Sequence, residues 1–228
     1  SCTGMISTTT TDANGYYLFT QDAQGNPLQT DTYSVTFATP TGYLPTLANN
    51  PSGTTGDAED SDNVNGQSAL VGLQAGEWNQ SVDAGFYRPA AIGDVVWYDA
   101  DKDGIQDFDE VGIAGVIVTL FDQDNQVLMT TTTQGDGSYL FAGLTPGDYH
   151  LRFDAPPGYV ASPANLGGNE AFDSDVDATG ASEIVTLVSG EQNLQVDAGY
   201  ALLTGQPATL GGTVWYDADK DGIQDAGE

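Results

Sequence analysis

Short segments of apolar or alternating residues, separated by turn-forming residues, recur along the middle of the chain. Residues 148–154 (DYHLRFD) alternate, which places Tyr149, Leu151 and Phe153 on one side of a predicted strand. Residues 115–121 (GVIVTLF) are rich in β-branched side chains, a composition typical of a buried strand. We find no segment with the periodicity of an amphipathic helix. The hydrophobic pattern therefore predicts an all-β protein.

Seven such segments fall between residues 92 and 200, at a spacing typical of β-sandwiches. They are residues 92–98, 115–121, 126–133, 138–143, 148–154, 183–189 and 193–200. We expect them to form a seven-stranded antiparallel β-sandwich.

Parts of the sequence repeat, which indicates tandem modules. Residues 93–110 read GDVVWYDADKDGIQDFDE, and residues 211–228 read GGTVWYDADKDGIQDAGE. Three further pairs are residues 11–19 with 133–141, 40–46 with 156–162, and 81–87 with 195–201. The predicted organisation is a first module at 1–88 that lacks its opening strand and acidic loop, a complete module at 92–200, and the opening of a further module at 210–228.

Two interpretations fit this arrangement. The chain is a window from a longer array, or residues 210–228 of one chain complete the first module of the next chain. The second interpretation would build a head-to-tail filament by strand addition. The joint at 88–91 is short and contains Pro89, so we expect it to be stiffer than the longer joint at 203–209.

The charge is strongly negative, with 33 acidic residues against four Lys and Arg and a formal net charge of -29. This composition argues against binding to nucleic acid or to an anionic membrane surface. Of the acids, 26 are Asp, the residue favoured in turns and in metal-binding loops. Uncompensated charge destabilises a compact state, so either bound cations or a salt-adapted surface is expected. Cys2 is the only cysteine, which excludes a disulfide within the chain.

An acidic loop follows the first strand of the complete module. Counted from Asp99, acids occupy positions 1, 3, 5, 9 and 12, with Gly104 at position 6. This is the ligand spacing of an EF-hand loop, although no flanking helices are predicted. The expected calcium (Ca2+) ligands are Asp99, Asp101, Asp103, the Ile105 carbonyl, Asp107 and Glu110, and in the second copy Asp217, Asp219, Asp221, Ile223, Asp225 and Glu228. Magnesium fits a carboxylate cage of this kind less well.

A second group of acids precedes the last strands of each module, and it is either a further metal site or a polar loop. The candidate ligands are Asp173, Asp175, Asp177 and Asp197 in the complete module, and Asp60, Asp62 and Asp83 in the first module. Asp94, beside the first strand, is a further candidate. Asp122 and Asp124 are either ligands or residues of a hairpin turn, and Asp136 is expected to be a turn residue.

Side chains suited to catalysis are few, so we do not expect an enzyme. His150 is the only histidine and is expected on the exposed side of its strand, which disfavours zinc. The acids fit loop metal sites better than the paired carboxylates of glycosidases. Trp97 and Trp215 share a repeat position and are expected to pack in the core or at a joint, whereas Trp78 lies in a predicted turn.

The motifs WYDADKDGIQD, DGSYLF, GLTPGDYHLRF, PPGY and VDAGY resemble those of the B repeats of serine-aspartate-repeat (Sdr) surface adhesins. These repeats are a branch of the Cna-B-like, prealbumin-like β-sandwiches, and the resemblance covers nearly the whole chain. It implies extracellular, secreted or surface-attached tandem modules in which bound calcium stiffens a stalk. Some Cna-B relatives carry a Lys–Asn isopeptide bond, which is not expected here because Lys102 and Lys220 both lie in acidic loops.

Two functional hypotheses follow from the sequence. The favoured one is a calcium-binding structural stalk or filament whose partners are neighbouring repeats or copies of the same chain. The alternative is an adhesive module that binds a host or matrix ligand through a concave site. The sequence shows clustered metal-loop acids and no pattern that predicts a concave site.

Overall fold

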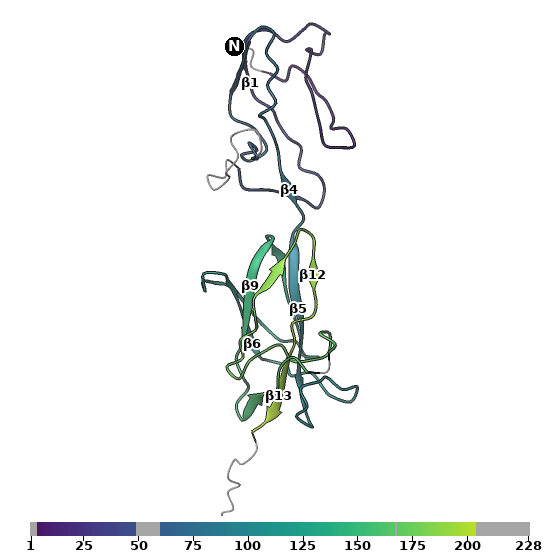
Figure 1. Ribbon diagram of the computed structural model, residues 1–228, viewed down its shortest axis with the longest axis vertical. Helices are drawn as coiled ribbons and strands as arrows, with labels where there is room; N and C mark the ends of the chain where they lie inside the picture. The colour runs from purple at the N-terminus through teal and green to yellow at the C-terminus, as the bar shows by residue number, and fades with distance from the viewer. Residues whose placement is uncertain (1–3, 49–59, 167, 204–228) are drawn as a thin grey trace, which may run out of the picture. The chain divides into compact units, whose positions relative to one another are not determined.

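The computed structural model describes residues 4–48, 60–166 and 168–203, and these residues form strands, turns and loops without a helix (Figure 1). The chain divides into two compact units. Unit 1 comprises Ser1–Ile92, Phe141–Asp148 and Val185–Asn193, and unit 2 comprises Gly93–Leu140, Tyr149–Ile184 and Leu194–Glu228. No helix in the described residues is long and apolar enough to cross a membrane.

Four short strands lie in the described part of the first module. Strand β1 (Asp31–Tyr33) pairs antiparallel with β3 (Val71–Leu73), and β2 (Leu44–Pro45) pairs antiparallel with β4 (Phe86–Tyr87). Among the described residues, every fully buried apolar side chain belongs to the stretch from Ala90 to Ala201, so the first module has only a partly shielded core.

A small aromatic cluster holds the first module together locally. The ring of Tyr17 packs edge-on against Phe19 and Phe37, with ring centroids 5.9 and 5.7 Å away. The hydroxyl of Tyr17 donates a 2.5 Å hydrogen bond to the carbonyl of Val82. This contact connects Tyr17 to the irregular segment that precedes β4.

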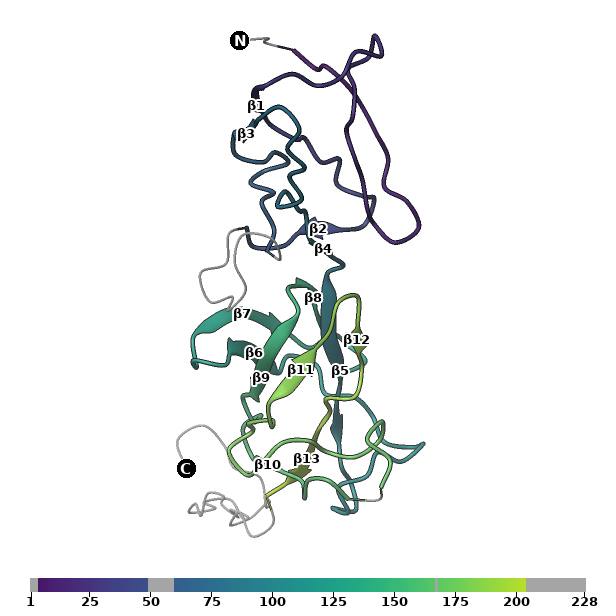
Figure 2. The ribbon, with the colours of Figure 1, turned by 45° about the horizontal axis from the view of Figure 1, so that its top comes forward.

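Nine strands follow in the described residues between 90 and 203. They are β5 (Ala90–Tyr98), β6 (Ile117–Asp122), β7 (Val127–Thr132), β8 (Ser138–Leu144), β9 (Gly147–Phe153), β10 (Tyr159–Ala161), β11 (Val185–Leu187), β12 (Gln192–Asn193) and β13 (Ala198–Leu202). One sheet has the order β10-β13-β5-β12, with β8 also paired to β5, and the other has the order β11-β9-β6-β7 (Figure 2). The prediction of an all-β sandwich is confirmed.

The strand count and the pairing differ from the seven antiparallel strands that we expected. Strand β5 pairs in parallel with both β12 and β13. The predicted strand 193–200 is divided because the backbone N–H of Asp197 donates to the side chain of Asp175 instead of to a neighbouring strand. Strand β10 was not predicted, since its short apolar run follows two prolines and a glycine.

The alternation predicted for residues 148–154 is present in β9. Tyr149, Leu151 and Phe153 are buried. His150, which we expected to be exposed, is half-buried because its ring stacks on Phe121 with 4.8 Å between the ring centroids. Trp97 is fully buried, as expected for a core residue. Trp78 is 71% exposed, and Trp215 lies outside the described residues.

Candidate metal centre

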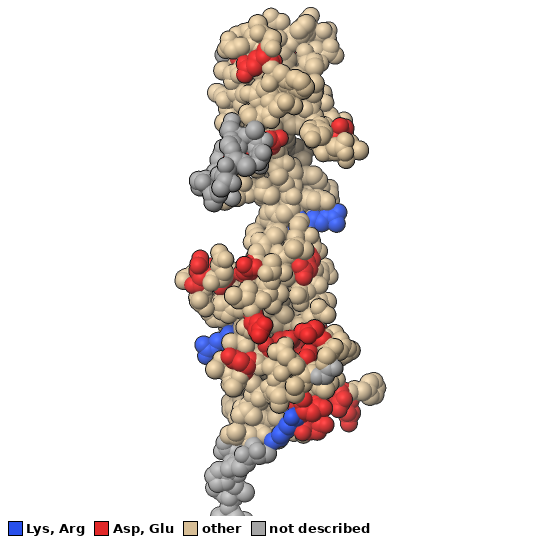
Figure 3. Space-filling model, in the orientation of Figure 1, with Lys and Arg blue, Asp and Glu red and all other residues tan. Residues whose placement is uncertain are grey.

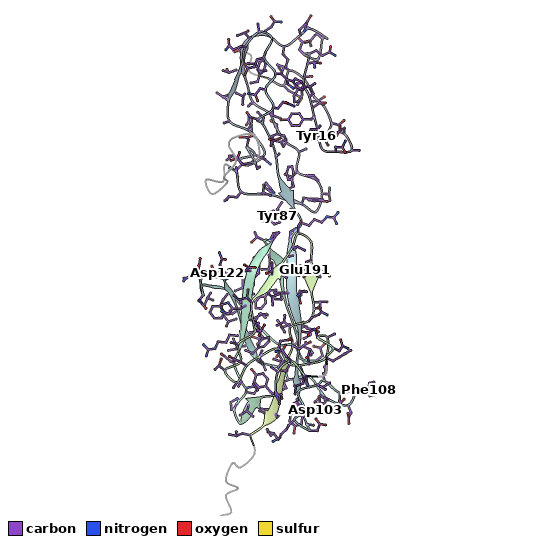
Figure 4. All side chains as sticks on the ribbon, in the orientation of Figure 1. Tyr16, Tyr87, Asp103, Phe108, Asp122 and Glu191 are labelled. Carbon is purple, nitrogen blue, oxygen red and sulfur yellow. The ribbon has the colours of Figure 1, made fainter. Side chains whose placement is uncertain are left out.

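The first acidic loop (residues 99–110) begins directly after β5, and its two ends are fastened by the backbone. The N–H of Tyr98 donates to the carbonyl of Val111 at 2.9 Å, and the N–H of Asp99 donates to the carbonyl of Tyr200 in β13 at 3.1 Å. Asp99 is therefore fully buried at the base of the loop. Figure 4 labels Asp103 and Phe108, which both belong to this loop, and Phe108 is fully exposed.

Asp99 organises the backbone of this loop. One carboxylate oxygen accepts a 2.6 Å hydrogen bond from the N–H of Lys102, and the other accepts a 3.0 Å bond from the N–H of Gly104. Gly104 has a φ of 77°, and a Cβ added there would lie 2.2 Å from the carbonyl oxygen of Pro163. Glycine is thus required both by the conformation and by the close approach.

The remaining predicted ligands of the loop lie along this frame. Carboxylate oxygens of Asp99, Asp101 and Asp103 all lie within 4.8 Å of one another. The carboxylate of Glu110 reaches back over the loop, where it accepts hydrogen bonds from the N–H of Ala100 at 2.7 Å and of Asp107 at 3.1 Å. The structure thus groups three of the predicted ligands, Asp99, Asp101 and Asp103, whereas Asp107 and Glu110 are not part of that group.

Two acids of this loop have raised pKa values. Desolvation, followed by the charges of neighbouring aspartates of which Asp103 contributes most, raises the pKa of Asp107. Desolvation also raises the pKa of Glu110, an effect that the hydrogen bonds to its carboxylate reduce. A raised pKa means that the ionised form of a carboxyl group is destabilised in this loop. A bound hard cation would stabilise the ionised form.

The second acidic loop (residues 170–177) lies beside the first. Residues Ile105 and Asp173 form a β-bridge, the N–H of Ser174 donates to the Gly104 carbonyl at 3.0 Å, and the N–H of Gln106 donates to the Phe172 carbonyl at 2.6 Å. Two predicted metal sites that are about 70 residues apart in the sequence are therefore joined through the backbone. Acidic side chains gather over this part of unit 2 in Figure 3.

Carboxylate oxygens of Glu170, Asp173 and Asp175 lie within 4.8 Å of one another. Asp173 is buried, and its Oδ1 atom has no hydrogen-bond partner among the described residues. Glu170 is not among the ligands predicted from the sequence. The spacing E-x-x-D-x-D of Glu170, Asp173 and Asp175 could have indicated it as a ligand, but Ala171 and Phe172 separate Glu170 from the aspartates.

Asp197 is fully buried and lies next to this cluster, because its backbone N–H donates a hydrogen bond to the carboxylate of Asp175. Its Oδ1 atom accepts a 3.0 Å hydrogen bond from the N–H of Val95, whereas its Oδ2 atom is buried without a partner among the described residues. Desolvation, with the charge of Asp94 second, raises the pKa of Asp197 to about 9. Desolvation likewise raises the pKa of Asp175 to about 7 and raises that of Asp94.

An unpaired carboxylate oxygen inside a protein is strongly destabilising when ionised, so such groups are paired or bind metals. Calcium is held by six to eight oxygen ligands, often carboxylates. The buried, partnerless oxygens of Asp173 and Asp197 beside two further acids therefore fit a hard divalent cation.

Other predicted ligands lie in turns. The Oδ1 atom of Asp177 accepts hydrogen bonds from the N–H and hydroxyl of Thr179 and from the N–H of Ala181, and these bonds lower its pKa. Oδ1 of Asp122 accepts from the N–H groups of Asp124 and Gln126 in the β6–β7 hairpin. Asp136 bonds Ser138 in the same way, as expected for a turn residue.

The first module repeats part of the second cluster within unit 1. The N–H of Asp83 donates to Oδ2 of Asp62 at 2.9 Å, and Oδ1 of Asp60 is buried without a hydrogen-bond partner among the described residues. Desolvation and then the charges of Asp62 and Asp60 raise the pKa of Asp83. The second copy of the first acidic loop, from Asp217 to Glu228, lies outside the described residues.

The chain is similar in sequence to serine-aspartate repeat-containing proteins of staphylococci. Serine-aspartate repeat-containing protein F of Staphylococcus epidermidis is 40% identical over 225 residues, covering 98% of this chain and 12% of that protein. Serine-aspartate repeat-containing protein E of Staphylococcus aureus (strain USA300) is 39% identical over 227 residues, covering 99% of this chain and 18% of that protein. The chain thus spans less than a fifth of the length of these relatives.

Among solved structures, the minor pilin GBS52 of Streptococcus agalactiae is 16% identical, with 62% of each chain covered and a TM-score of 0.36. The shaft pilin SpaA of Lactobacillus rhamnosus GG is 14% identical, with 52% of this chain and 50% of the pilin covered and a TM-score of 0.31. These values are too low to support an inference about this chain.

The model of the SdrD B-like domain family matches residues 2–86 and 90–200. These two matches cover most of the chain, and the relatives that are about 40% identical to it carry the Sdr name. The resemblance read from the sequence motifs is confirmed: the chain belongs to the SdrD B-like domain family.

Proposed function

We propose that this chain is a calcium-binding structural repeat that acts as a stiff, non-catalytic spacer in an extracellular bacterial surface protein. In this proposal its modules are residues 1–88, 92–200 and 210–228, and its partners are neighbouring repeats. Family membership and the family name of its relatives support a surface repeat. The acidic loops support the calcium.

The observation that carries the proposal is the pair of buried carboxylate oxygens without a hydrogen-bond partner, Oδ2 of Asp197 and Oδ1 of Asp173. A protein that only needed an acidic, soluble surface would gain nothing from placing carboxylates there. A cation would give these oxygens a partner and would offset the desolvation, and after it the neighbouring charges, that raise the pKa values of Asp175 and Asp197.

Two neighbouring sites are assigned in unit 2. The first would be held by Asp99, Asp101, Asp103, the carbonyl of Ile105, Asp107 and Glu110. The second would be held by Glu170, Asp173 and Asp175, with Asp197 and Asp94 behind them. A third, in unit 1, would use Asp60, Asp62 and Asp83. Asp177 is not assigned, because its Oδ1 atom accepts three hydrogen bonds within its own turn and because it is not among the acids whose oxygens lie within 4.8 Å of one another.

The arrangement explains how metal binding stiffens the protein. The backbone bonds between Gly104–Gln106 and Phe172–Ser174 hold two strongly negative loops against each other. Without bound cations the carboxylates of the two loops repel each other. Bound calcium would replace this repulsion by attraction between the carboxylates of both loops and the ions that they hold. Because the ion binds only the folded loops, a concentration of 100 times Kd adds about 2.7 kcal/mol per site to the free energy of unfolding. Extracellular sites typically bind at about 10⁻⁴ to 10⁻³ M.

Thermal unfolding of the full chain in calcium, in magnesium and in excess chelator tests the proposal. We expect the melting temperature to fall in chelator, to return with calcium, and to return less with magnesium. Calorimetric titration of the chelated protein with calcium should show more than one bound ion. An unchanged melting temperature together with no heat of calcium binding would overturn the calcium assignment and leave the acids as surface charge.

A further inference from the structure

Arg88 lies in the short segment that joins β4 to β5, and its backbone is held by the loop between β11 and β12. Its N–H donates to the Oγ of Ser189 at 2.9 Å, and its carbonyl accepts from the N–H of Gly190 at 3.0 Å. Two residues later the N–H of Ala91 donates to the carbonyl of Glu191 at 2.9 Å. All of these residues belong to unit 1. The joint segment is therefore fixed to this loop at three successive points.

The loop is shaped to fit closely against Arg88. Gly190 has a φ of 78°, and a Cβ added there would lie 3.2 Å from the Cβ of Arg88. The contact continues as a parallel pairing of β12 with β5, in which Gln192 is the partner of Ala91. Figure 4 labels Tyr87 and Glu191, the residues that border this contact.

The side chain of Arg88 makes a different contact. Its guanidinium carbon lies over the ring of Tyr43, 4.8 Å from the ring centroid, which is cation–π geometry. Tyr43 immediately precedes β2, the partner strand of β4. One residue thus contacts a loop more than 100 positions later through its backbone and a tyrosine 45 positions earlier through its side chain.

Comparison of the repeats shows that the module itself does not require an arginine here. The segment VDAGFYR (82–88) corresponds to VDAGYAL (196–202), so Leu202 occupies the position of Arg88. Leu202 pairs with Tyr159, the repeat counterpart of Tyr43. The strand pairing is therefore the same with leucine, and what the arginine adds at residue 88 is the contact of its guanidinium with the tyrosine ring.

Arg88 contacts an aromatic ring although the chain is rich in carboxylates. Although the sequence has 33 carboxylates, the ion pair found among the described residues joins Arg152 to Asp154, and Arg88 is placed over an aromatic ring instead. A planar guanidinium stacks on an aromatic ring in a defined geometry. This contact can fix the orientation of the segment at Arg88 relative to Tyr43, and it does so without a metal ion.

We propose that Arg88 is the positioning residue of the joint at 88–91, which its guanidinium holds against Tyr43 while its backbone is held by the 189–191 loop. This inference rests on the proposed role of the chain as a stiff spacer. It makes the stiffness of this joint independent of calcium.

Electron–electron distance measurement between two spin labels tests the inference. The labels are placed at Thr8 and Thr130, exposed positions that correspond to each other in the repeats, in a Cys2→Ser background. We expect one narrow distance distribution for the otherwise unsubstituted protein, with calcium and in chelator. Arg88→Ala should broaden it, Tyr43→Leu should broaden it in the same way, and Arg88→Lys should restore part of the order.

Arg152→Ala is the matched control, because Arg152 is an exposed arginine with a single weak ion pair at 4.0 Å. It should leave the distribution narrow. The melting temperature of Arg88→Ala should stay at that of the parent, which separates a role in positioning from a role in folding. If Arg88→Ala does not fold, Tyr43→Leu decides the question alone.

A distribution that stays narrow in both Arg88→Ala and Tyr43→Leu, or that broadens equally in Arg152→Ala, would overturn the inference and leave the calcium spacer intact. A distribution that is already broad in the parent protein would overturn the inference and the stiff spacer together. Loss of the calcium effect on the melting temperature, with the Arg88 effect retained, would overturn only the calcium assignment.

Discussion

The backbone N–H of Asp197 donates a 2.6 Å hydrogen bond to Oδ2 of Asp175, while the N–H of Asp175 donates to the carbonyl of Asp197 at 2.9 Å. The first module has the same reciprocal pair, in which Asp83 donates to Oδ2 of Asp62 and Asp62 donates to the Asp83 carbonyl. The arrangement is present in both repeats. It places two carboxylates side by side at the entry to the last strand, and it does so without any contribution from the first acidic loop.

The first prediction concerns the charge of Asp197. Asp197→Asn keeps the shape of the buried side chain and removes the ionisable group whose pKa is raised to about 9. In chelator we expect a melting temperature equal to or above that of the parent, because an unpaired buried carboxyl is replaced by a neutral amide. In saturating calcium we expect a lower melting temperature than the parent, because one oxygen ligand with its charge is lost. Thermal unfolding in both conditions measures the difference.

Asp136→Asn is the control for this substitution. Asp136 is exposed, and its hydrogen bonds to Ser138 lower its pKa. Its loss should lower the melting temperature by the same small amount in calcium and in chelator. If Asp197→Asn retains the full stabilisation by calcium, the assignment of Asp197 to a metal site is wrong.

The second prediction concerns pH. In the metal-free folded protein the pKa values of Asp175 and Asp197 are raised to about 7 and about 9, against about 3.9 for an unfolded aspartate. Between these values the folded state binds more protons than the unfolded state. The stability that these two groups contribute in chelator should therefore be fully present below about pH 4 and be lost as the pH rises, up to about pH 7 for Asp175 and about pH 9 for Asp197. The loss is at most about 1.4 kcal/mol per pH unit for Asp197 and less for Asp175, which is partly exposed.

Calcium should reverse this dependence, because metal binding requires the ionised carboxylates and releases their protons. The calcium affinity should rise with pH over the interval in which the stability of the chelated protein falls. Urea unfolding in chelator at pH 5, 7 and 8.5, together with calcium titrations at the same pH values, provides the measurement. A chelated protein whose stability increases across this interval would contradict the buried, metal-free carboxyls.

The third prediction separates two reasons for glycine in the first acidic loop. Gly104→Ala places a Cβ 2.2 Å from the carbonyl oxygen of Pro163 at a φ of 77°, so the substitution combines backbone strain with a clash. Gly115→Ala has a similar φ of 82° and meets nothing within 4 Å, so it reports the strain alone. We expect Gly115→Ala to cost about 1 to 2 kcal/mol and Gly104→Ala to cost more than that. Chemical denaturation of both variants in saturating calcium measures the difference, and equal losses would contradict the close packing of the loop on Pro163.

Much of this architecture could be predicted from the sequence, because strands and acidic loops both depend on local spacing. Both patterns can be recognised within a short stretch of about a dozen residues: the alternation around Leu151 predicts a strand, and the spacing of the acids from Asp99 to Glu110 predicts a loop that could bind a metal. The parallel pairing of β5 with β13 could not be predicted, because it depends on which distant segments meet. For the same reason the spacing of the acids did not reveal that the loop at Ile105 is bridged to Asp173.

The last prediction concerns a tyrosine anchor that occurs in both modules. The hydroxyl of Tyr139 donates a buried 2.5 Å hydrogen bond to the carbonyl of Val196, and Tyr17 donates a bond of the same length to Val82. Val196 immediately precedes Asp197. Tyr139→Phe should therefore lower the free energy of unfolding by about 1 to 3 kcal/mol, because it leaves a buried carbonyl without its donor. It should also weaken calcium binding, because it frees the segment that holds Asp197.

Tyr17→Phe is the matched variant, since its acceptor precedes Asp83 in the same way but Tyr17 is less buried. We expect a smaller loss of stability and no change in calcium binding at the sites of unit 2. Urea unfolding and calorimetric calcium titration of both variants compare the two anchors. If Tyr139→Phe loses stability but keeps the calcium affinity of the parent at every site, then Asp197 is held by the Asp175 pair alone, and the tyrosine serves the core and not the metal centre.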